Sequence, residues 1–386
     1  MELLNNEQLK QLQQLRKWLH QNPELSGKEL QTSSKIEGFI QQTAPTKLIK
    51  GIGGTGIAAI YHFTDDGPTV LVRADMDALP IDEINTFSHK SQTPGVSHKC
   101  GHDGHSTILA GLALVLQNKP LKAGRVVLLF QPEEETGQGA AKVIADEAFK
   151  MILPDYTIAL HNLPGFDMGT VIIKEGPFAA ASTGMIINIK GTSSHAAHPE
   201  QGNSPATMMA KTILQLQEIP QKQSDKFTDF ALITLIHARL GEVAFGTNPG
   251  NAQLMATLRT FFNDDMDILK KEAEKICKIL AEDYQMIIDI SYTEEFPATI
   301  NHSDLVELLK EVCEQIGTEV EQIKQPFRWS EDFGHFTSHY KGMLFGLGSG
   351  KDSPGLHNPD YDFPDEIIPS GVEIFYQTLE KILSKS

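Results

Sequence analysis

The sequence predicts an α/β protein: a larger domain built on an open mixed sheet with helices on both faces, interrupted by a smaller α+β domain of βαββαβ order. Two observations support this. Short β-rich apolar runs alternate with longer amphipathic segments at both ends of the chain, which is typical of strands buried between helices. The middle of the chain instead follows the split βαβ order. At 386 residues the chain has room for two domains.

The larger domain is predicted to consist of buried strands and amphipathic helices. An N-terminal helix is predicted from Leu9, Leu12, Leu15 and Leu19, which recur at helical spacing and stop before Pro23. Four short apolar runs predict buried strands, at 70–72, 126–130, 156–160 and 343–347. Three further helical patterns lie over 108–116, 303–316 and 366–384. The larger domain is therefore placed at 1–182 and 295–386.

The inserted domain is placed at 183–294, where the pattern changes. Apolar residues alternate with mixed neighbours in four predicted strands, at 185–189, 231–235, 251–262 and 286–293. Between them lie two helical patterns, near 204–217 and 265–283. The order strand–helix–strand–strand–helix–strand is the split βαβ arrangement.

Composition excludes several function classes. A formal charge of −17 argues against binding to nucleic acids or anionic membranes, which requires a basic face. No apolar run reaches the roughly 20 residues of a membrane span. The first residues lack the basic and apolar regions of a signal peptide, so a cytoplasmic location is expected. Cys100, Cys277 and Cys313 cannot form an even disulfide framework, which fits a reducing compartment. Cys277 and Cys313 read as buried thiols, whereas basic neighbours favour a thiolate at Cys100.

Candidate metal ligands gather where strands end. In open α/β sheets the ligand crevice lies outside the carboxyl ends of the strands. A glutamate from 133–135, His161 and His357 follow apolar runs. They join Cys100 and His102, which lie two residues apart, the spacing of a metal-binding turn. Two divalent cations that share a bridging ligand and a water need about five such ligands and a separate base. Sulfur, nitrogen and oxygen donors together suit zinc or manganese, with cobalt or nickel as alternatives.

Each candidate also has a structural interpretation. His161 alone could be a hydrogen-bonded core histidine, and His357 could cap a loop. Glu133–Glu135 alone could be a solvated acidic turn, and which glutamate binds metal is open at this point. His98 and His105 are expected to support the site without binding metal. The coincidence of positions favours the metal site over these separate interpretations.

Four motifs resemble the M20 metallopeptidase family, in particular its N-acyl-amino-acid amidohydrolase branch. That branch includes hippurate hydrolases, auxin-conjugate hydrolases and N-acetyl-diaminopimelate deacetylases. The motifs are Arg73-Ala74-Asp75-Met76-Asp77-Ala78-Leu79-Pro80, Cys100-Gly101-His102-Asp103-Gly104-His105, Gln131-Pro132-x-Glu134-Glu135 and Leu356-His357-Asn358-Pro359-x-Tyr361-Asp362-Phe363. The resemblance extends from Leu15 to about Tyr376.

The resemblance implies a role for each matched residue. It implies a dinuclear domain interrupted by a smaller lid domain, 183–294, through which such proteins usually form homodimers. Cys100 matches the bridging ligand, and the other ligands would be His102, Glu135, His161 and His357. The family pattern Gln-Pro-x-Glu-Glu makes Glu134 the general base and leaves Glu133 on a variable, solvated position.

Two lid segments match as well. His195, in Ser194-His195-Ala196-Ala197-x-Pro199, resembles a histidine that reaches an active site, typically the dimer partner's, and steadies a developing oxyanion. Arg259 resembles an arginine that binds a substrate carboxylate, although a salt bridge on the strand surface is an alternative. Relatives commonly have an Asn-x-x-Pro turn where this chain has Gly246-Thr247-Asn248-Pro249, so Asn248 is the candidate to replace the displaced asparagine.

The resulting prediction is a two-metal amidohydrolase that splits a small N-acyl-amino acid into a carboxylic acid and a free amino acid. One alternative is a dipeptidase or carboxypeptidase of the same fold, which would cut peptide bonds. Another is a catalytically silent protein that binds amino acids or peptides and keeps the two-domain clamp.

Overall fold

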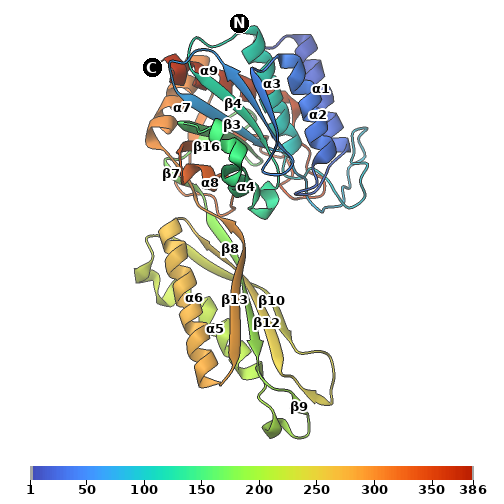
Figure 1. Ribbon diagram of the computed structural model, residues 1–386, viewed down its shortest axis with the longest axis vertical. Helices are drawn as coiled ribbons and strands as arrows, with labels where there is room; N and C mark the ends of the chain where they lie inside the picture. Colours follow the sequence, from blue (N-terminus) through green and yellow to red (C-terminus); the bar gives the residue numbers. More distant parts are fainter. Residues whose placement is uncertain (1–2, 385–386) are drawn as a thin grey trace. The chain divides into compact units, whose positions relative to one another are not determined.

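The computed structural model describes residues 3–384, which divide into two compact units (Figure 1). The first unit runs up to Phe178 and resumes over Thr299–Gln325 and from Asp332 onward. The second comprises Ala179–Ala298 and Pro326–Glu331. No sequence pattern assigned the short segment 326–331 to the second unit. Main-chain bonds hold it there: the Ala180 amide donates to the carbonyls of Phe327 (3.1 Å) and Trp329 (3.0 Å).

The first unit is built on an eight-stranded mixed sheet of order β1-β2-β4-β3-β5-β16-β6-β15. Its strands are β1 (Lys47–Ile52), β2 (Gly56–His62), β3 (Thr69–Asp75), β4 (Arg125–Gln131), β5 (Tyr156–Leu163), β6 (Val171–Ile173), β15 (Val320–Gln322) and β16 (Lys341–Gly348). The central strands β4, β3, β5 and β16 are mutually parallel. The sequence placed one buried run in each of these four, and that prediction is confirmed. Parallel strands need cover on both faces, which is why these runs are apolar throughout.

Helices cover this sheet. They are α1 (Asn6–Gln21), α2 (Leu30–Ile40), α3 (His102–Asn118), α4 (Gly139–Ala145), α7 (Ser303–Ile316), α8 (Gly334–Thr337) and α9 (Ile368–Ser384). Single-turn 3₁₀ segments are η1 (Gln41–Thr43), η2 (Glu134–Thr136), η3 (Glu147–Met151) and η6 (Asp365–Ile367). Helix α1 begins at a capping box in which Asn5 and Gln8 each bond the other's main-chain N–H, and it ends before Pro23 as predicted.

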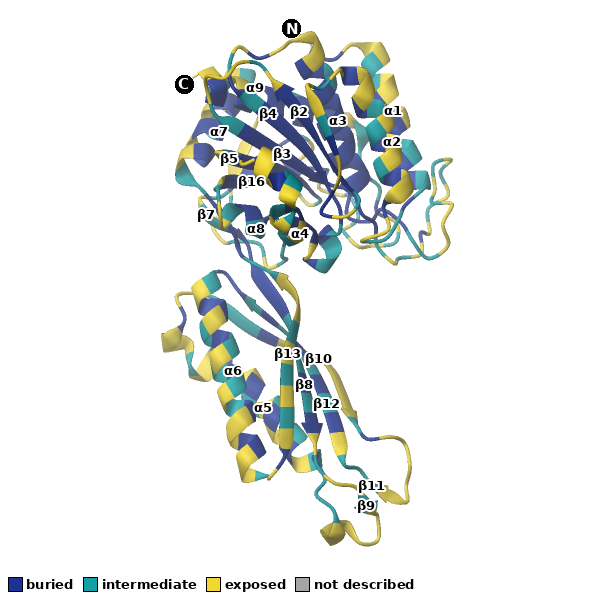
Figure 2. Cartoon of the chain, in the orientation of Figure 1, coloured by how far each residue is buried: buried dark blue, intermediate teal, exposed yellow. Residues whose placement is uncertain are grey.

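The two faces of the sheet carry different side chains because strand residues alternate. On β3, Val70 and Val72 join the apolar core that α1, α3, α7 and α9 also build. Leu71 and Arg73 point to the other face, where Asp332 connects Arg73 to the first turn of α4. Figure 2 shows the central strands of the sheet buried along nearly their whole length, whereas the edge strands β1 and β15 are more exposed.

The second unit has the predicted βαββαβ order. Its antiparallel sheet, of order β10-β12-β8-β13, comprises β8 (Ala181–Lys190), β10 (Ala231–Leu240), β12 (Asn251–Thr260) and β13 (Ile287–Phe296). Helices α5 (Ala206–Lys222) and α6 (Asn263–Asp283) pack on it. Shorter elements are β9 (Ser194–His195), β11 (Thr247–Asn248), η4 (Pro199–Gln201) and η5 (Ser224–Lys226).

Two further short strands, β7 (Gly176–Ala179) and β14 (Thr299–Asn301), pair with each other. Apart from Ala179, both strands belong to the first unit.

Helix α5 is longer than the sequence predicted. The pattern predicted an end near residue 217, but the helix continues through Pro220 to Lys222. Proline removes only one main-chain N–H, and in the last turn little helix remains to be disrupted. Buried Leu216 and Ile219 hold this turn on the sheet.

None of the helices among the described residues is both long and apolar enough to cross a membrane.

Candidate metal centre

Polar side chains converge at the carboxyl ends of the parallel strands of the first unit. Asp75 ends β3, and the glutamates of η2 follow β4 directly. His161 lies near the end of β5, opposite Gly346 of β16. Strand β16 leads onward to the loop that carries His357. This is the edge at which an open α/β sheet places its ligand crevice.

All five predicted metal ligands come together there. Their donor atoms form overlapping groups whose members lie within 4.8 Å of one another: Cys100 with His102 and His161, Cys100 with Glu135 and His357, and His102 with Glu134 and Glu135. Cys100, His102 and Glu135 each belong to two of these groups. The set of one thiol, three imidazoles and two carboxylates has the mixed donor chemistry of a transition-metal site.

The turn at Gly101 places Cys100 and His102 side by side. Gly101 has φ 94°, a left-handed conformation, and a Cβ at this position would collide with the Asn162 side chain. Only glycine fits without strain. Helix α3 begins at His102 itself, before the first residue of the helical pattern predicted over 108–116. The motif is thus a glycine turn that runs directly into a helix, and this geometry fixes both donors.

Two histidines present the same nitrogen to the cluster. His102 Nδ1 lies 2.9 Å from the Asp77 carbonyl oxygen, and His161 Nδ1 lies 2.9 Å from the Asn162 carbonyl oxygen. A carbonyl only accepts, so each Nδ1 carries a proton, and Nε2 is the nitrogen of each ring that is left to bind a cation. His161 Nε2 lies 3.5 Å from Cys100 Sγ. Among the described residues, nothing hydrogen-bonds the buried His102 Nε2.

The electrostatics favour a positive charge near His102 Nε2. Burial by itself would lower the pKa of His102, but Asp75 and other acidic neighbours raise it well above its usual value. Burial lowers the pKa of His161, with His105 adding to the effect, so that ring stays neutral. Neutral imidazole is the form that binds metals. The acidic surroundings of His102 Nε2, together with its missing partner, therefore fit a bound cation.

The protonation state expected for Cys100 is wrong for the chain without a cation. Burial raises the pKa of its thiol well above the usual value, and Glu135 adds to the effect. The neighbours expected to favour a thiolate do not do so. Lys99 Nζ contacts Glu83 (2.5 Å) and the Tyr361 carbonyl (2.7 Å), and burial lowers the pKa of His98 to about 4. Ionisation of Cys100 thus depends on a bound cation.

The three glutamates point to different partners. Glu133 has φ 56° and pairs with Lys142; its side chain is only 16% exposed, so it is not the solvated residue the sequence indicated. Glu134 Oε1 accepts a bond from the Asp332 amide (3.3 Å), and Oε2 lies 3.9 Å from His102 Nε2. Glu135 Oε1 lies 3.8 Å from Nε2 of both His102 and His357. Burial raises the pKa of Glu135 to about 7.

His357 is the exposed member of the cluster. Its φ of 66° is rare for a residue with a side chain, and its amide donates to the Lys99 carbonyl at 2.7 Å. That bond ties the His357 loop to the residue preceding Cys100. Its side chain is 52% exposed, so this side of the cluster faces solvent.

His105 supports the site in the way the sequence indicated. Its Nδ1 lies 2.7 Å from Asp75 Oδ1, and the Asn162 amide donates to its Nε2 (3.1 Å). The sequence analysis placed Asp75 and Asp77 in a matched motif but assigned them no role. Asp75 ends β3 and Asp77 follows it, so the strand-end rule applied to the other residues also applies to these two. Asp332 follows no apolar strand, so no sequence signal indicated it.

The three lid candidates lie in the second unit, whereas all the candidate metal ligands lie in the first. His195 is exposed, and its Nδ1 accepts the Ala197 amide at 3.0 Å. An amide can only donate, so the proton of the neutral ring is on Nε2. Asn248 pairs with Ser194 across β11 and β9 and donates to its hydroxyl (3.1 Å), so it stabilises the His195 turn.

Arg259 is half-buried on β12 and donates through Nη1 to the Arg328 carbonyl (2.8 Å) and the Ser330 hydroxyl (2.9 Å). Within the described part of the chain no carboxylate forms a salt bridge with it. Burial lowers its pKa without an acidic neighbour to offset the effect. The surface salt bridge considered as an alternative is therefore absent from these residues.

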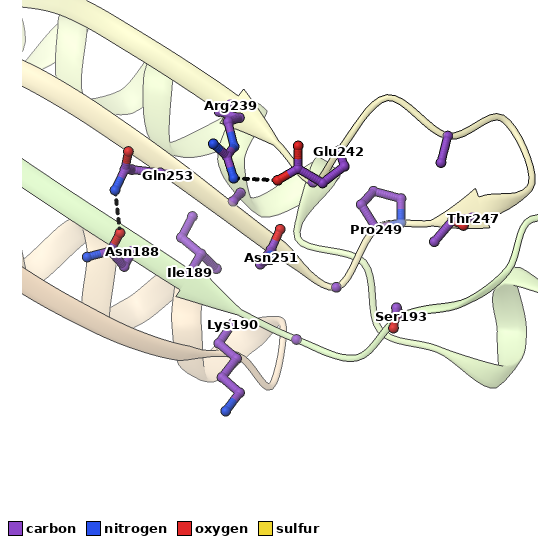
Figure 3. A pocket seen from close by; sticks show the side chains of 15 residues that line it. Asn188, Ile189, Lys190, Ser193, Arg239, Glu242, Thr247, Pro249, Asn251 and Gln253 are labelled. Atoms are coloured by element: carbon purple, nitrogen blue, oxygen red, sulfur yellow. Dashed lines mark hydrogen bonds and ion pairs between the residues drawn. The ribbon is translucent and has the colours of Figure 1, made fainter.

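The second unit also carries a pocket of about 650 Å³ at the end of its sheet (Figure 3). Arg239 and Glu242 form an ion pair on one wall, and Asn188 bonds Gln253 on another. Thr247 and Ser193, next to the His195 turn, also line it. The residues lining this pocket include no histidine or cysteine, so it offers no site like that of the first unit.

Comparison with known proteins gives consistent results. The profile of peptidase family M20/M25/M40 matches residues 71–381. An N-acetyl-L-cysteine deacetylase of Bacillus subtilis is 30% identical, with 98% of this chain and 89% of that protein covered. An N-acetyldiaminopimelate deacetylase of Priestia megaterium is 31% identical, with 89% and 91% covered. The solved structure of a dinuclear metal-binding peptidase of the M20 family from Bacillus subtilis superposes with a TM-score of 0.85 at 24% identity, covering 99% and 100% of the two chains.

Proposed function

The chain belongs to peptidase family M20/M25/M40 and is a hydrolase of amide bonds, and from that premise we propose that it hydrolyses N-acyl-amino acids to a carboxylic acid and a free amino acid. The observation that carries the proposal is the convergence of Cys100, His102, Glu135, His161 and His357 at the strand ends. The two deacetylase relatives, both of which cover most of the chain, support the N-acyl-amino-acid class of substrate.

These five residues, Cys100 among them, would hold two divalent cations. Zinc or manganese suits the donor set best, and cobalt or nickel would also be accepted. When bound, two cations supply Lewis-acid polarisation of the acyl oxygen and lower the pKa of an attacking water.

Glu134 is assigned as the general base. Its Oε1 is held by the Asp332 amide, and its Oε2 faces His102 Nε2. In this position Oε2 takes a proton from the water as its oxygen bonds to the acyl carbon. When the carbon–nitrogen bond breaks, Glu134 returns that proton to the leaving nitrogen, which departs as the amine of the free amino acid.

Two lid residues would bind the substrate's oxygens. His195 carries its proton on the exposed Nε2, ready to donate to the acyl oxygen as negative charge develops there. Arg259, which lacks an acidic partner among the described residues, would bind the α-carboxylate through its remaining N–H groups. Asn248 would hold the His195 turn in shape.

We further propose that the protein is a homodimer in which the lid of one chain supplies His195 to the partner's metal site. His195 lies on an exposed turn of the second unit, next to the fully exposed Val243 and Phe245. Unpartnered apolar side chains of this kind are typical of a protein interface. Three unpaired cysteines fit a reducing, cytoplasmic compartment.

The proposal is tested with a panel of N-acetyl- and N-benzoyl-amino acids assayed beside the matching dipeptides, after loading with each divalent metal in turn. Hydrolysis of the N-acyl compounds with kcat/KM at least tenfold above that of the dipeptides is expected. Preference for dipeptides would favour the peptidase alternative. Tight binding of substrate without turnover in the fully metal-loaded protein would favour a binding protein.

A further inference from the structure

Asp332 is a fully buried carboxylate at the edge of the candidate site, and its side chain is held from several directions. It accepts bonds from Arg73 Nη2 (2.7 Å) and from Gln131 Nε2 (2.9 and 2.8 Å to its two oxygens). The Ala140 amide, in the first turn of α4, donates to Oδ2 at 2.8 Å. A carboxylate with this many donors has one accessible orientation, because any rotation would leave buried donors without acceptors.

The same residue contacts Glu134 through its main chain. The Asp332 amide donates to Glu134 Oε1 at 3.3 Å, so one oxygen of that carboxylate is held. The other oxygen, Oε2, then faces His102 Nε2 at 3.9 Å. Because the side chain of Asp332 fixes the position of its own amide, the network behind Asp332 determines how Glu134 is turned.

Arg73 connects this arrangement to the rest of the site. Its guanidinium is completely buried and bonds Asp332 through Nη2 and Asp75 through Nη1 (2.6 Å), while Nε bonds Gln131 Oε1 (2.9 Å). Asp75 in turn contacts His105. A buried carboxylate is costly unless it is paired and hydrogen-bonded, and Arg73 supplies both for Asp332.

We propose that Asp332 is a positioning residue for the general base: with Arg73, Gln131 and Ala140 it fixes the amide that orients Glu134, so that Oε2 is aimed at the metal ligands. This inference rests on the proposed function, in which Glu134 moves the proton. Loss of this bond removes one of the contacts that orient the carboxylate, and a base that points correctly only part of the time is slower even when substrate binds normally.

The first test is Asp332→Asn. The new amide group has the same shape but places an N–H₂ against Gln131, Arg73 or Ala140, all of which are donors. We expect kcat to fall by about 10- to 100-fold, in line with the cost of a misplacement of about 1 Å in an active site. KM should stay within about twofold and bound metal should be unchanged, because Asp332 is not among the five candidate ligands.

A matched control is Asp265→Asn. Asp265 is also buried, on α6 of the second unit, and accepts bonds from the Thr228 amide (3.0 and 3.1 Å) and hydroxyl (3.2 Å). Asp265→Asn should lose a similar amount of stability, measured as a shift in the urea midpoint, with kcat unchanged.

If Asp332→Asn fails to fold, Gln131→Met is tested in its place. This change removes two of the bonds to Asp332 at nearly constant side-chain volume. A loss of kcat of a few-fold at constant KM is expected.

A double-mutant cycle separates positioning from general damage. In a Glu134→Asp background the shortened side chain no longer places its carboxylate where Glu134 does. In that background, adding Asp332→Asn should lower kcat by less than a further threefold. The inference would be overturned if the effects of Glu134→Asp and Asp332→Asn on kcat were fully additive. A fall in the metal content of Asp332→Asn, or an equal loss of kcat in Asp265→Asn, would also overturn it. So would normal kcat in Asp332→Asn beside an active wild-type enzyme, which leaves the proposed function intact. Absence of amide hydrolysis in the metal-loaded wild type would overturn both.

Discussion

Replacing Glu134 by glutamine should stop turnover while leaving the metal site intact. The glutamine carbonyl can still accept the Asp332 amide bond that Glu134 Oε1 accepts at 3.3 Å, so the side chain keeps its place. Its amide nitrogen replaces Oε2, which faces His102 Nε2 at 3.9 Å. A neutral amide cannot take a proton from water. Because a general base contributes about 10²- to 10⁴-fold, kcat should fall by that factor, or about 3–5 kcal/mol in activation free energy.

The matched control is Glu133→Gln, one residue earlier in the same turn. It removes only the ion pair with Lys142, whose side chain is 46% exposed. Partly exposed pairs contribute about 0–1 kcal/mol to stability, so kcat should stay within about twofold. Initial rates with an N-acyl-amino acid and metal content by mass spectrometry are measured for both variants. An inactive Glu133→Gln beside an active Glu134→Gln would show that the register is shifted by one residue. Loss of metal in Glu134→Gln would make Glu134 a ligand instead.

Three further outcomes are expected. Chelation should expose Cys100 to alkylation, because the sulfur is then no longer bound to a cation. The reaction should need high pH, because burial keeps the pKa of the free thiol raised. Equal labelling rates of this residue with and without metal, measured by peptide mapping, would contradict a ligand role. Mixing His195→Ala with Glu134→Gln chains should restore part of the hydrolysis if His195 crosses the dimer interface, since one site of each heterodimer is then complete; verified heterodimers without activity would refute that crossing. His20 lies between Glu83 and Asp103 (3.0 and 2.8 Å), and although burial alone would lower its pKa, these acids raise it to about 9. The contribution of His20 to the free energy of unfolding is then fully present below pH 6.5 and lost as the pH rises through 9, by at most about 3 kcal/mol. In urea unfolding across this range, the stability of the wild type should fall with rising pH, whereas that of His20→Gln should not show this fall.

Much of the fold and the candidate metal ligands could be predicted from the sequence because both follow from local patterns. Buried parallel strands must be apolar on both faces, so their runs are visible without knowledge of the fold. Residues that follow such runs arrive at one edge of the sheet whatever the details of packing. His161 and His357 were found in this way, and Cys100 was found with His102 from their two-residue spacing. The structure places their donor atoms in overlapping groups with Glu135.

The roles of the three glutamates could not be predicted from the local sequence pattern. Residues 133–135 are chemically identical, and spacing alone could not distinguish them without the family resemblance. Their directions depend on the left-handed backbone at Glu133, on Lys142, and on the amide of Asp332, which is distant in sequence. The short segment 326–331 joined the second unit for a similar reason, since its contacts are main-chain bonds to Ala180 that carry no side-chain signal.

The sequence by itself determined which side chains reach the strand ends, because strand periodicity and chain direction are local properties. Only the tertiary structure decided their protonation and orientation. Burial raises the pKa of the Cys100 thiol and keeps it protonated in the metal-free chain, while Lys99, its neighbour in sequence, contacts Glu83 and the Tyr361 carbonyl instead. The direction of Glu134 is likewise set by Arg73 and Asp332, which lie far apart in the chain and meet only when the sheet forms. Desolvation and hydrogen-bond geometry are properties of the surrounding packing, and no stretch of sequence contains that packing.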